Sequence, residues 1–269
     1  MKTFQNPSAP FFPAGTPDDA CVEAGFRSGA IGTHTSRTIM FDELSAVLAA
    51  TPSDAARADY AAAIIESNCL SKPTASTRRL SSQRVGELYA LDPAVAVFRV
   101  LRKLWDLDPA ARRLLAVSCA LARDPLLAAT APSILALSPG GEFLRDPLKS
   151  TLRAVVGDRL NEDVLDKVVR NAASSWTQSG HLQGRTFKKR HLVQATAAAA
   201  AFAVYLAQAA GFRGAEIFAS AWFAVLDTSP SAARALALEA KRLGLIDLRM
   251  AGDVVELDIG RLTARVARA

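Results

Sequence analysis

Hydrophobic residues recur at helical spacing along most of this chain, between breaks marked by proline and glycine. The spacing of Ile39, Leu44 and Leu48 predicts a helix that follows Ser36, and Ser53 opens a second one. Beyond a proline-containing turn, a Ser/Thr cap leads into an arginine-rich helix that ends near residue 91. The same patterning predicts further helices over about 93–105, 109–122, 125–137, 146–156, 161–178, 194–210 and 214–226, and another after 229.

Only two segments alternate apolar and polar residues around a turn-forming glycine, and both lie in the C-terminal half. They cover about 182–191 and 245–259, and each follows a helix. A helix followed by a β-hairpin is the arrangement of a winged helix. The predicted fold class is therefore mainly α, a helical protein with winged-helix-like modules in its C-terminal half.

Two stretches suggest how the chain is divided. Residues 1–24 are rich in proline, glycine and aspartate and lack an apolar period, which predicts a flexible N-terminal arm or a segment draped over the surface. The sequence SPGGEF, from Ser138, is the clearest internal break. It divides an N-terminal helical module over 25–138 from a C-terminal helical module over 141–269 that contains both hairpins.

Composition narrows the class of protein. The longest apolar run, Thr196 to Ala210, is about 15 residues and short of the roughly 20 that a membrane span needs. The N-terminus lacks the apolar segment of a signal peptide, so we expect a cytoplasmic protein without membrane contact. Cys21, Cys69 and Cys119 lie far apart without metal-binding spacing, which predicts reduced thiols.

No catalytic motif is present. Phosphate-binding loops, dinucleotide fingerprints, zinc-protease and nucleophile-elbow patterns are missing, so no catalytic residue, no metal site and no cofactor is predicted, and the protein is not expected to be an enzyme. Gly25, Gly29 and Gly32 fit a turn before a helix better than a phosphate loop. Asp124 and Asp227 border helix breaks and are expected to cap helices.

Basic and short polar residues gather in two segments that could contact DNA phosphates and base edges. The net charge, 32 basic against 26 acidic residues, is compatible with an anionic partner. The first segment is one face of the arginine-rich helix, with Ser76, Thr77, Arg78, Arg79, Gln83 and Arg84. The second is a helix followed by a basic hairpin, with Lys167, Arg170, Asn171, Ser174, Ser175, Gln178, Arg185, Lys188, Lys189 and Arg190.

An ordinary solvated helix face would explain the first segment equally well, because arginine favours helices and can pair with Glu87 at helical spacing. In the second segment, Trp176 is expected to pack in the core rather than stack on bases. Replacing Lys188, Lys189 and Arg190 together by alanine is expected to weaken duplex binding and to leave folding intact.

The N-terminal half also resembles a known family. Gly29, before the first long helix, is followed by an Asn-x-Leu sequence and by a helix that opens with a Thr/Ser-Thr-x-x-Arg pattern; the matching positions are Gly29, Asn68, Leu70, Thr74, Ser76, Thr77 and Arg79. Over about residues 25–135 the chain resembles the BrxA-like proteins of bacteriophage-exclusion (BREX) defence systems. The resemblance implies a DNA-binding accessory protein with winged-helix character that works beside other phage-defence proteins.

Two functions remain open. The first is binding of double-stranded DNA through a basic helix and wing, as an accessory protein of anti-phage defence. The alternative is a helical protein-interaction or assembly component without direct nucleic-acid binding, whose basic surface meets an acidic protein partner. Counterion release separates them, since phosphate binding weakens steeply as salt rises.

Overall fold

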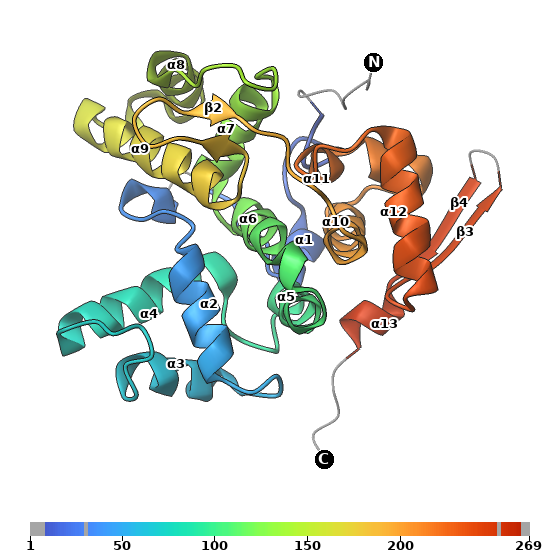
Figure 1. The fold of residues 1–269 in the computed structure, drawn as a ribbon, viewed down its shortest axis with the longest axis horizontal. Coiled ribbons are helices and arrows are strands. Elements are labelled where there is room, and N and C mark those ends of the chain that lie inside the picture. The colour runs from blue at the N-terminus through green and yellow to red at the C-terminus, as the bar shows by residue number, and fades with distance from the viewer. Residues whose placement is uncertain (1–8, 30–31, 252–253, 265–269) are drawn as a thin grey trace.

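A computed structural model describes residues 9–29, 32–251 and 254–264 and confirms that the protein is mainly helical (Figure 1). The N-terminal half contains α1 (Asp19–Ala24), the 3₁₀ helix η1 (Thr33–Thr35), α2 (Phe41–Ala50), α3 (Arg57–Ile65), α4 (Ala75–Tyr89), α5 (Ala96–Leu107), the 3₁₀ helix η2 (Pro109–Ala111), α6 (Arg112–Arg123) and α7 (Pro125–Leu135).

The C-terminal half alternates helices with two small hairpins. It contains α8 (Arg145–Val156), the 3₁₀ helix η3 (Gly157–Arg159), α9 (Glu162–Gln178), β1 (Leu182–Gln183), β2 (Lys189–Arg190), α10 (Ala197–Ala209), the 3₁₀ helix η4 (Gly214–Ala219), α11 (Ala221–Ala224), α12 (Pro230–Arg242), β3 (Asp247–Ala251), β4 (Val254–Asp258) and α13 (Gly260–Thr263).

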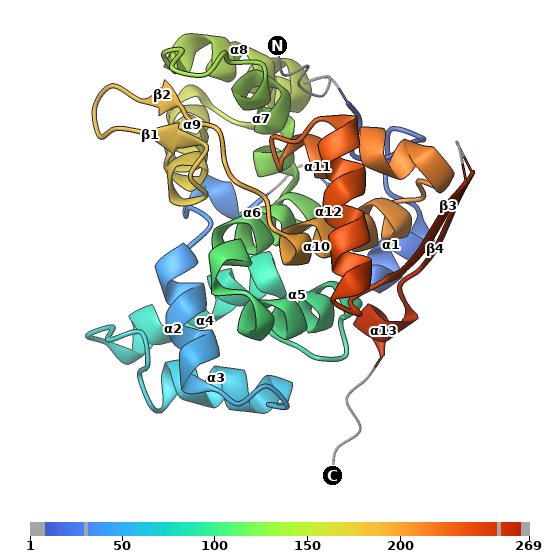
Figure 2. The same ribbon diagram turned by 45° about the vertical axis from the view of Figure 1, so that its right-hand side comes forward.

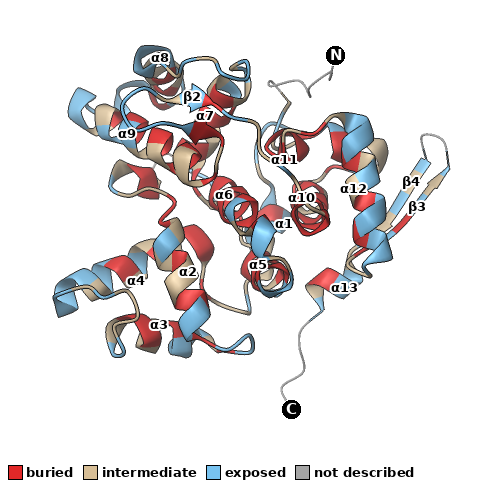
Figure 3. Ribbon diagram, viewed as in Figure 1, coloured by how far each residue is buried: buried red, intermediate tan, exposed pale blue. Residues whose placement is uncertain are grey.

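The alanine-rich helix α10 lies at the centre of the molecule. Its residues from Ala197 to Ala207 are all buried, which Figure 3 shows as a helix coloured red along its length. It packs against α5, α6, α11, α12 and η4, and Figures 1 and 2 both place it between α5 and α12. Small side chains let these neighbours approach closely, so a helix that is apolar all round becomes a core element. Within the described residues, no helix combines the length and apolar character needed to cross a bilayer.

The two predicted modules share one hydrophobic core. Side chains on both sides of the SPGGEF break, including Leu101, Leu115, Phe202 and Trp176, belong to the same buried cluster. Helix α9 packs against η1, α6 and α7, and α10 packs against α5 and α6. The division into two modules at residues 138–141 stays a prediction, and in this structure the two stretches pack together.

The N-terminal segment is packed against the body from residue 9 onward. The Trp222 indole donates a hydrogen bond to the Phe11 carbonyl at 2.9 Å, and the rings of these two residues meet edge to face with centroids 4.7 Å apart. Cys21 on α1 is buried. Residues 9–24 therefore lie against the body of the protein, whereas residues 1–8 of the predicted arm lie outside the described part.

Most helix boundaries follow local signals, but the stretch over 214–226 differs from the single helix predicted. It forms η4 and then the short α11, because Ser220 between them has an extended backbone (φ −72°, ψ 161°). Gly214 begins η4 with a positive φ of 55°. These two positions interrupt regular α-helical geometry although the apolar spacing is helical.

Both hairpins form where alternation predicted strands. In the first, Leu182 pairs with Arg190 and Gln183 with Lys189; in the second, β3 and β4 pair over five residues each. The SPGGEF segment adds to the first hairpin, since Glu142 forms a bridge with Lys189. The order of a helix followed by a hairpin is thus present twice, as α9 with β1–β2 and α12 with β3–β4.

Candidate nucleic-acid interface

Helix α9 positions the second predicted segment, and its ends are set by local chemistry. The Asn161 side chain caps its N-terminus by accepting the Val164 N–H at 2.9 Å, and Gly180 beyond its C-terminus has a positive φ of 91°. One side of the helix is buried. Trp176 is fully buried there and donates from its indole to Thr130 Oγ1 at 2.8 Å, which confirms its predicted role in core packing.

The outer side of α9 and the hairpin carry several exposed cations. Lys167 and Arg170 on α9 are exposed, as are Arg185 and Lys189 on the hairpin. Within the described part of the chain, these four residues form no ion pair within 4.0 Å, and Lys188 forms none. The chain has no aspartate or glutamate between residues 167 and 190. These residues define what is called here the basic surface. Two acids lie beside it: Glu142 forms a backbone bridge with Lys189, and the pKa of Asp166 is lowered by the hydrogen bond from Lys149 and further by the charge of Arg170.

Lys188 fastens the hairpin onto α9. Its Nζ donates to Thr177 Oγ1 at 2.9 Å and to the Gly184 carbonyl at 3.1 Å. Burial lowers the pKa of Lys188, and the nearby positive charge of Arg145 lowers it further. Ser174, one turn before Gln178 on α9, is half-buried.

Arg145, at the start of α8, is a cation of this surface that sequence reasoning missed. It is exposed, and its charge acts on Lys188 from about forty residues away along the chain. The Phe143 N–H donates to the Lys188 carbonyl at 2.8 Å, which brings the SPGGEF segment beside β2. No local pattern in the sequence signals this contact.

The prediction that Arg190 belongs to the DNA-contacting hairpin surface is wrong. It is only 3% exposed and forms a buried ion pair with Asp227, while its guanidinium also donates to the His181 and His191 carbonyls. Asp227 accepts the Val193 N–H at 2.9 Å as well, so it holds Arg190 rather than capping a helix as expected. Arg190 therefore cannot contact DNA in this structure, and its replacement is not expected to leave folding intact.

Three polar residues of α9 face inward instead of outward. Ser175 is fully buried and accepts the Ile39 N–H at 2.9 Å. The Asn171 amide donates to the His34 carbonyl at 2.8 Å. Gln178 accepts the Phe41 N–H at 3.1 Å and donates to a threonine hydroxyl at 3.0 Å. These side chains hold η1 and the start of α2 against α9, so their predicted DNA contacts are corrected to internal hydrogen bonds.

A buried Ser-His-Asp arrangement lies behind this face. His34 Nδ1 is 2.8 Å from Asp124 Oδ2, and His34 Nε2 is 2.8 Å from Ser175 Oγ. The three residues resemble a hydrolase triad in order and distance. Each is at most 1% exposed, and the Ser175 hydroxyl also contacts the Asn171 carbonyl at 2.8 Å. A substrate carbonyl cannot reach Ser175 here, so the arrangement joins η1, α7 and α9 structurally.

Asp124 is the centre of that network. Its Oδ1 accepts the Leu126 and Leu127 N–H groups at 3.0 and 3.1 Å, which confirms the predicted cap, and its Oδ2 also accepts the His34 N–H at 3.0 Å. Burial raises the pKa of Asp124, but the His34 charge and the donated hydrogen bonds outweigh burial and hold the pKa below its usual value. A Cβ at Gly32 would lie 2.0 Å from Asp124 Oδ1, so this turn requires glycine.

The arginine-rich helix α4 offers fewer free groups than its sequence suggests. Thr74 caps it and pairs with Thr77, and the Arg78 guanidinium donates to the Ile65 carbonyl at 3.0 Å. Gln83 and Arg84 both bind the Glu87 carboxylate, at 2.9 and 2.8 Å. Of the predicted residues on this helix, Ser76 and Arg79 are the exposed pair without such a bond among the described residues.

A polar hollow of about 390 Å³ lies beside α4. Arg27, Arg57 and Arg123 line it together with Gln83 and Glu87. Arg27 and Arg123 both donate to the Glu87 carbonyl at 3.2 Å. Burial lowers the pKa of Arg123, and the positive charge of Arg27 lowers it further. These arginines are distant in sequence, so no motif identifies them.

Comparisons with protein-family models, curated proteins and solved structures found no match. Within the described residues, no group of three or more His, Cys, Asp or Glu side chains could hold a metal ion.

The three cysteines are free thiols, of which Cys21 and Cys119 are buried. Burial raises the pKa of Cys21 to about 11 and that of Cys119 to about 12, which makes both poor nucleophiles at neutral pH.

Proposed function

We propose that this protein binds double-stranded DNA through the basic surface, with the outer side of α9 as the contacting helix and the β1–β2 hairpin as a wing. The supporting observation is that Lys167, Arg170, Arg185 and Lys189 are exposed and form no ion pair within 4.0 Å among the described residues, while no acid interrupts the chain between 167 and 190. Such cations release counterions from DNA on binding, which supplies affinity without sequence preference.

The C-terminal part of α9 and the hairpin make most of this contact. Near the N-terminus of α9, Glu162 and Asp166 are acidic, and both pair with Lys149 of α8, at 2.8 and 2.7 Å. Phosphates are therefore favoured toward Arg170 and the hairpin. With Gln178 engaged internally, the remaining groups are mostly long cations, so backbone contacts dominate over base reading.

A role in anti-phage defence is the wider setting of this proposal. The resemblance over residues 25–135 to BrxA-like proteins of BREX systems supports it, and it implies other phage-defence proteins as partners. A gene neighbourhood containing a methyltransferase and a phosphatase-like gene is the expected result. An isolated gene would count against this setting without touching DNA binding itself.

The experiment compares two matched pairs of exposed cations. In R185A/K189A one arginine and one lysine are removed from the hairpin; in K241A/R242A the same two residue types are removed from the exposed C-terminal turn of α12. Neither pair forms an ion pair among the described residues. Both variants lose two positive charges, so an effect of net charge alone is the same in both.

Affinity for random-sequence duplex is measured across a salt series by fluorescence anisotropy. We expect R185A/K189A to weaken binding and to reduce the slope of log affinity against log salt by up to about 0.9 per lost contact, with K241A/R242A close to wild type. Equal effects of the two variants would show general charge attraction and overturn the assigned surface. Absence of duplex binding by the wild-type protein would overturn the proposed function.

One observation favours a second candidate, a protein partner for the same face. Phe187 at the hairpin tip is 73% exposed, and Leu144, beside the segment that pairs with β2, is 58% exposed. Apolar side chains among cations are typical of protein interfaces as well. The helical assembly component would then bind an acidic protein, and Phe187→Ser would weaken that binding while leaving the salt slope for duplex DNA unchanged.

A further inference from the structure

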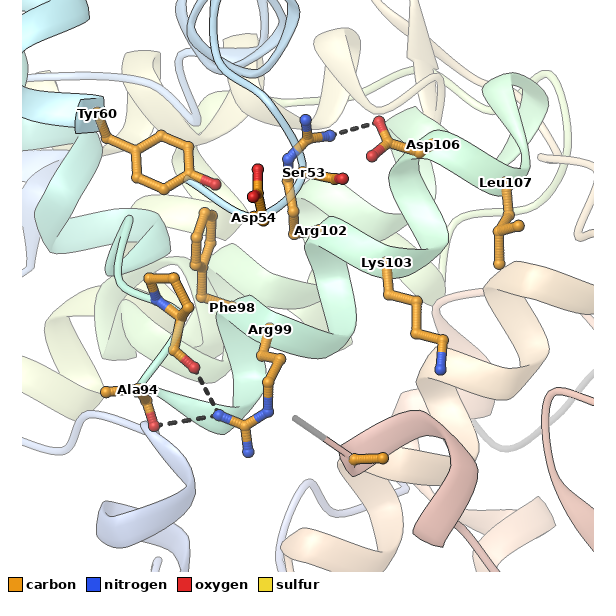
Figure 4. A pocket seen from close by; sticks show the side chains of 12 residues that line it. Ser53, Asp54, Tyr60, Ala94, Phe98, Arg99, Arg102, Lys103, Asp106 and Leu107 are labelled. Carbon is orange, nitrogen blue, oxygen red and sulfur yellow. Dashed lines mark hydrogen bonds and ion pairs between the residues drawn. The ribbon is translucent and has the colours of Figure 1, made fainter. Parts of the chain in front are cut away.

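A pocket of about 450 Å³ lies away from the basic surface, where α3, α5 and the end of α13 meet (Figure 4). Its lining comes from the loop at Ser53 and Asp54, from α3, from the turn before α5, from α5 itself and from Ala264. Volumes of about 300–1,000 Å³ are usual for small-molecule sites. This pocket is large enough for a small organic ligand.

Aromatic and aliphatic groups form most of the pocket wall. Tyr60 and Phe98 meet edge to face with ring centroids 5.2 Å apart, and both side chains are almost fully buried. Pro93 lines the pocket beside Ala94, which lies on one side in Figure 4, and Leu107, 59% exposed, lies on the other. Since Tyr60 and Phe98 are already buried, a ligand with an apolar body would remove from water mainly the exposed parts of Pro93, Ala94 and Leu107.

The charged groups of the pocket come mainly from one side of α5. Arg99, Arg102, Lys103 and Asp106 recur at helical spacing and all line the pocket. Arg102 is buried and pairs with Asp106, so these two charges offset each other. Asp54 is the remaining acid of the lining. The pocket therefore has one positive charge in excess.

Arg99 and Lys103 have spare donors. Arg99 donates to the Thr263 carbonyl at 3.2 Å and to the Pro93 carbonyl at 2.6 Å, and Lys103 donates to the Arg261 carbonyl at 2.6 Å. Neither forms an ion pair within the described residues. A guanidinium has five N–H groups and an ammonium has three, so both side chains can also bind an anion. Figure 4 shows them on the same side of α5.

We propose that this pocket binds a small organic monocarboxylate with an aromatic or branched aliphatic body. The body packs against Tyr60, Phe98 and Leu107, and the carboxylate binds Arg99 and Lys103. One excess positive charge matches one carboxylate, and the apolar wall disfavours inorganic anions, which would lose hydration without apolar contact. The site is independent of DNA binding.

The test uses ligands that differ in one feature at a time. Phenylacetate and 4-phenylbutyrate are the probes, their primary amides keep the body without the charge, and inorganic phosphate has charge without the body. Thermal unfolding of the full chain and isothermal titration calorimetry measure binding, because a ligand that binds the folded state raises the unfolding temperature as its concentration rises. Only the carboxylates are expected to do so.

Two exposed pocket residues and two matched controls locate the effect. Lys103→Met removes one proposed carboxylate contact, and Leu107→Glu places a negative charge at the mouth; each should weaken binding about fivefold or more. Lys241→Met on α12 and Val155→Glu on α8 make the same changes at exposed residues that do not line the pocket, and should bind like wild type.

Four results would overturn the proposal. They are no binding of any carboxylate, equal binding of the amides, equal binding of phosphate, and equal loss of binding in the control variants. Circular dichroism is measured on every variant, and a loss of binding is counted only where the helical signal and the unfolding temperature without ligand match the wild type. If Lys103→Met fails this control because it loses the contact with α13, Leu107→Glu provides the test.

Discussion

Removing Arg190 should destabilise the protein far more than removing its neighbour Lys189. The Arg190 and Asp227 side chains are 1% and 5% exposed, so alanine at 190 leaves a buried carboxylate without its charge partner. Breaking such a pair from one side typically costs about 3–5 kcal/mol. Lys189 is exposed and lacks an ion pair among the described residues, so Lys189→Ala should change stability by no more than about 0.5 kcal/mol.

Urea unfolding followed by circular dichroism and tryptophan fluorescence measures both variants. We expect a lower midpoint at an unchanged slope for Arg190→Ala, since the same surface is exposed on unfolding. Asp227→Asn keeps the side-chain shape, and asparagine tolerates the positive φ of 52° at this position. The double variant Arg190→Met, Asp227→Asn should recover part of the loss, because neither charge is then left unpaired in the interior.

A loss below about 1 kcal/mol for Arg190→Ala would refute this reasoning. So would equal losses for Arg190→Ala and Lys189→Ala, since the two residues would then share one environment. The result also decides how DNA binding is tested. A variant that includes Arg190 would combine loss of folding with loss of phosphate contact, whereas R185A/K189A separates them.

Three further predictions concern the interior. Burial lowers the pKa of His181 from 6.5 to about 4, so between these pH values the unfolded chain binds a proton that the folded protein does not. The free energy of unfolding is therefore highest above about pH 6.5 and falls by about 3 kcal/mol as the pH drops toward 4. His181→Gln should reduce this pH dependence, measured as urea midpoints at pH 7 and 5. Tyr60→Phe should be neutral or stabilising in thermal unfolding, because the buried hydroxyl lacks a hydrogen bond of normal geometry within the described part of the chain; a loss above about 1 kcal/mol would show that its contact with Arg102 or Thr51 is stabilising. Gly32→Ala should destabilise by about 1–3 kcal/mol, since its Cβ would overlap the buried Asp124 carboxylate, and an unchanged unfolding temperature would contradict that contact.

Local sequence was sufficient for most of the secondary structure. Asn161 and Thr74 cap α9 and α4 through hydrogen bonds to residues three positions ahead, and such contacts need only neighbouring residues. The hairpin turn at Gly184 also depends on neighbouring residues alone. A Cβ at this position would lie 2.1 Å from the carbonyl oxygen of Phe187, so the turn requires glycine. One exception, the stretch over 214–226, has helical apolar spacing, but its backbone breaks at Ser220.

The basic segment from Lys167 to Arg190 is visible in the sequence as a run of cations without acids, and this run by itself determined where an anionic partner is expected. Only the tertiary structure decided which members face water. Arg190 is buried in an ion pair with Asp227, which is 37 residues away in the chain. Ser175 is buried in hydrogen bonds with the His34 ring and the Ile39 N–H. Likewise, the end of α13 meets α5 at the pocket for which a monocarboxylate is proposed. Whether a polar side chain is free or satisfied depends on partners that are distant in sequence, and composition and periodicity carry no information about them.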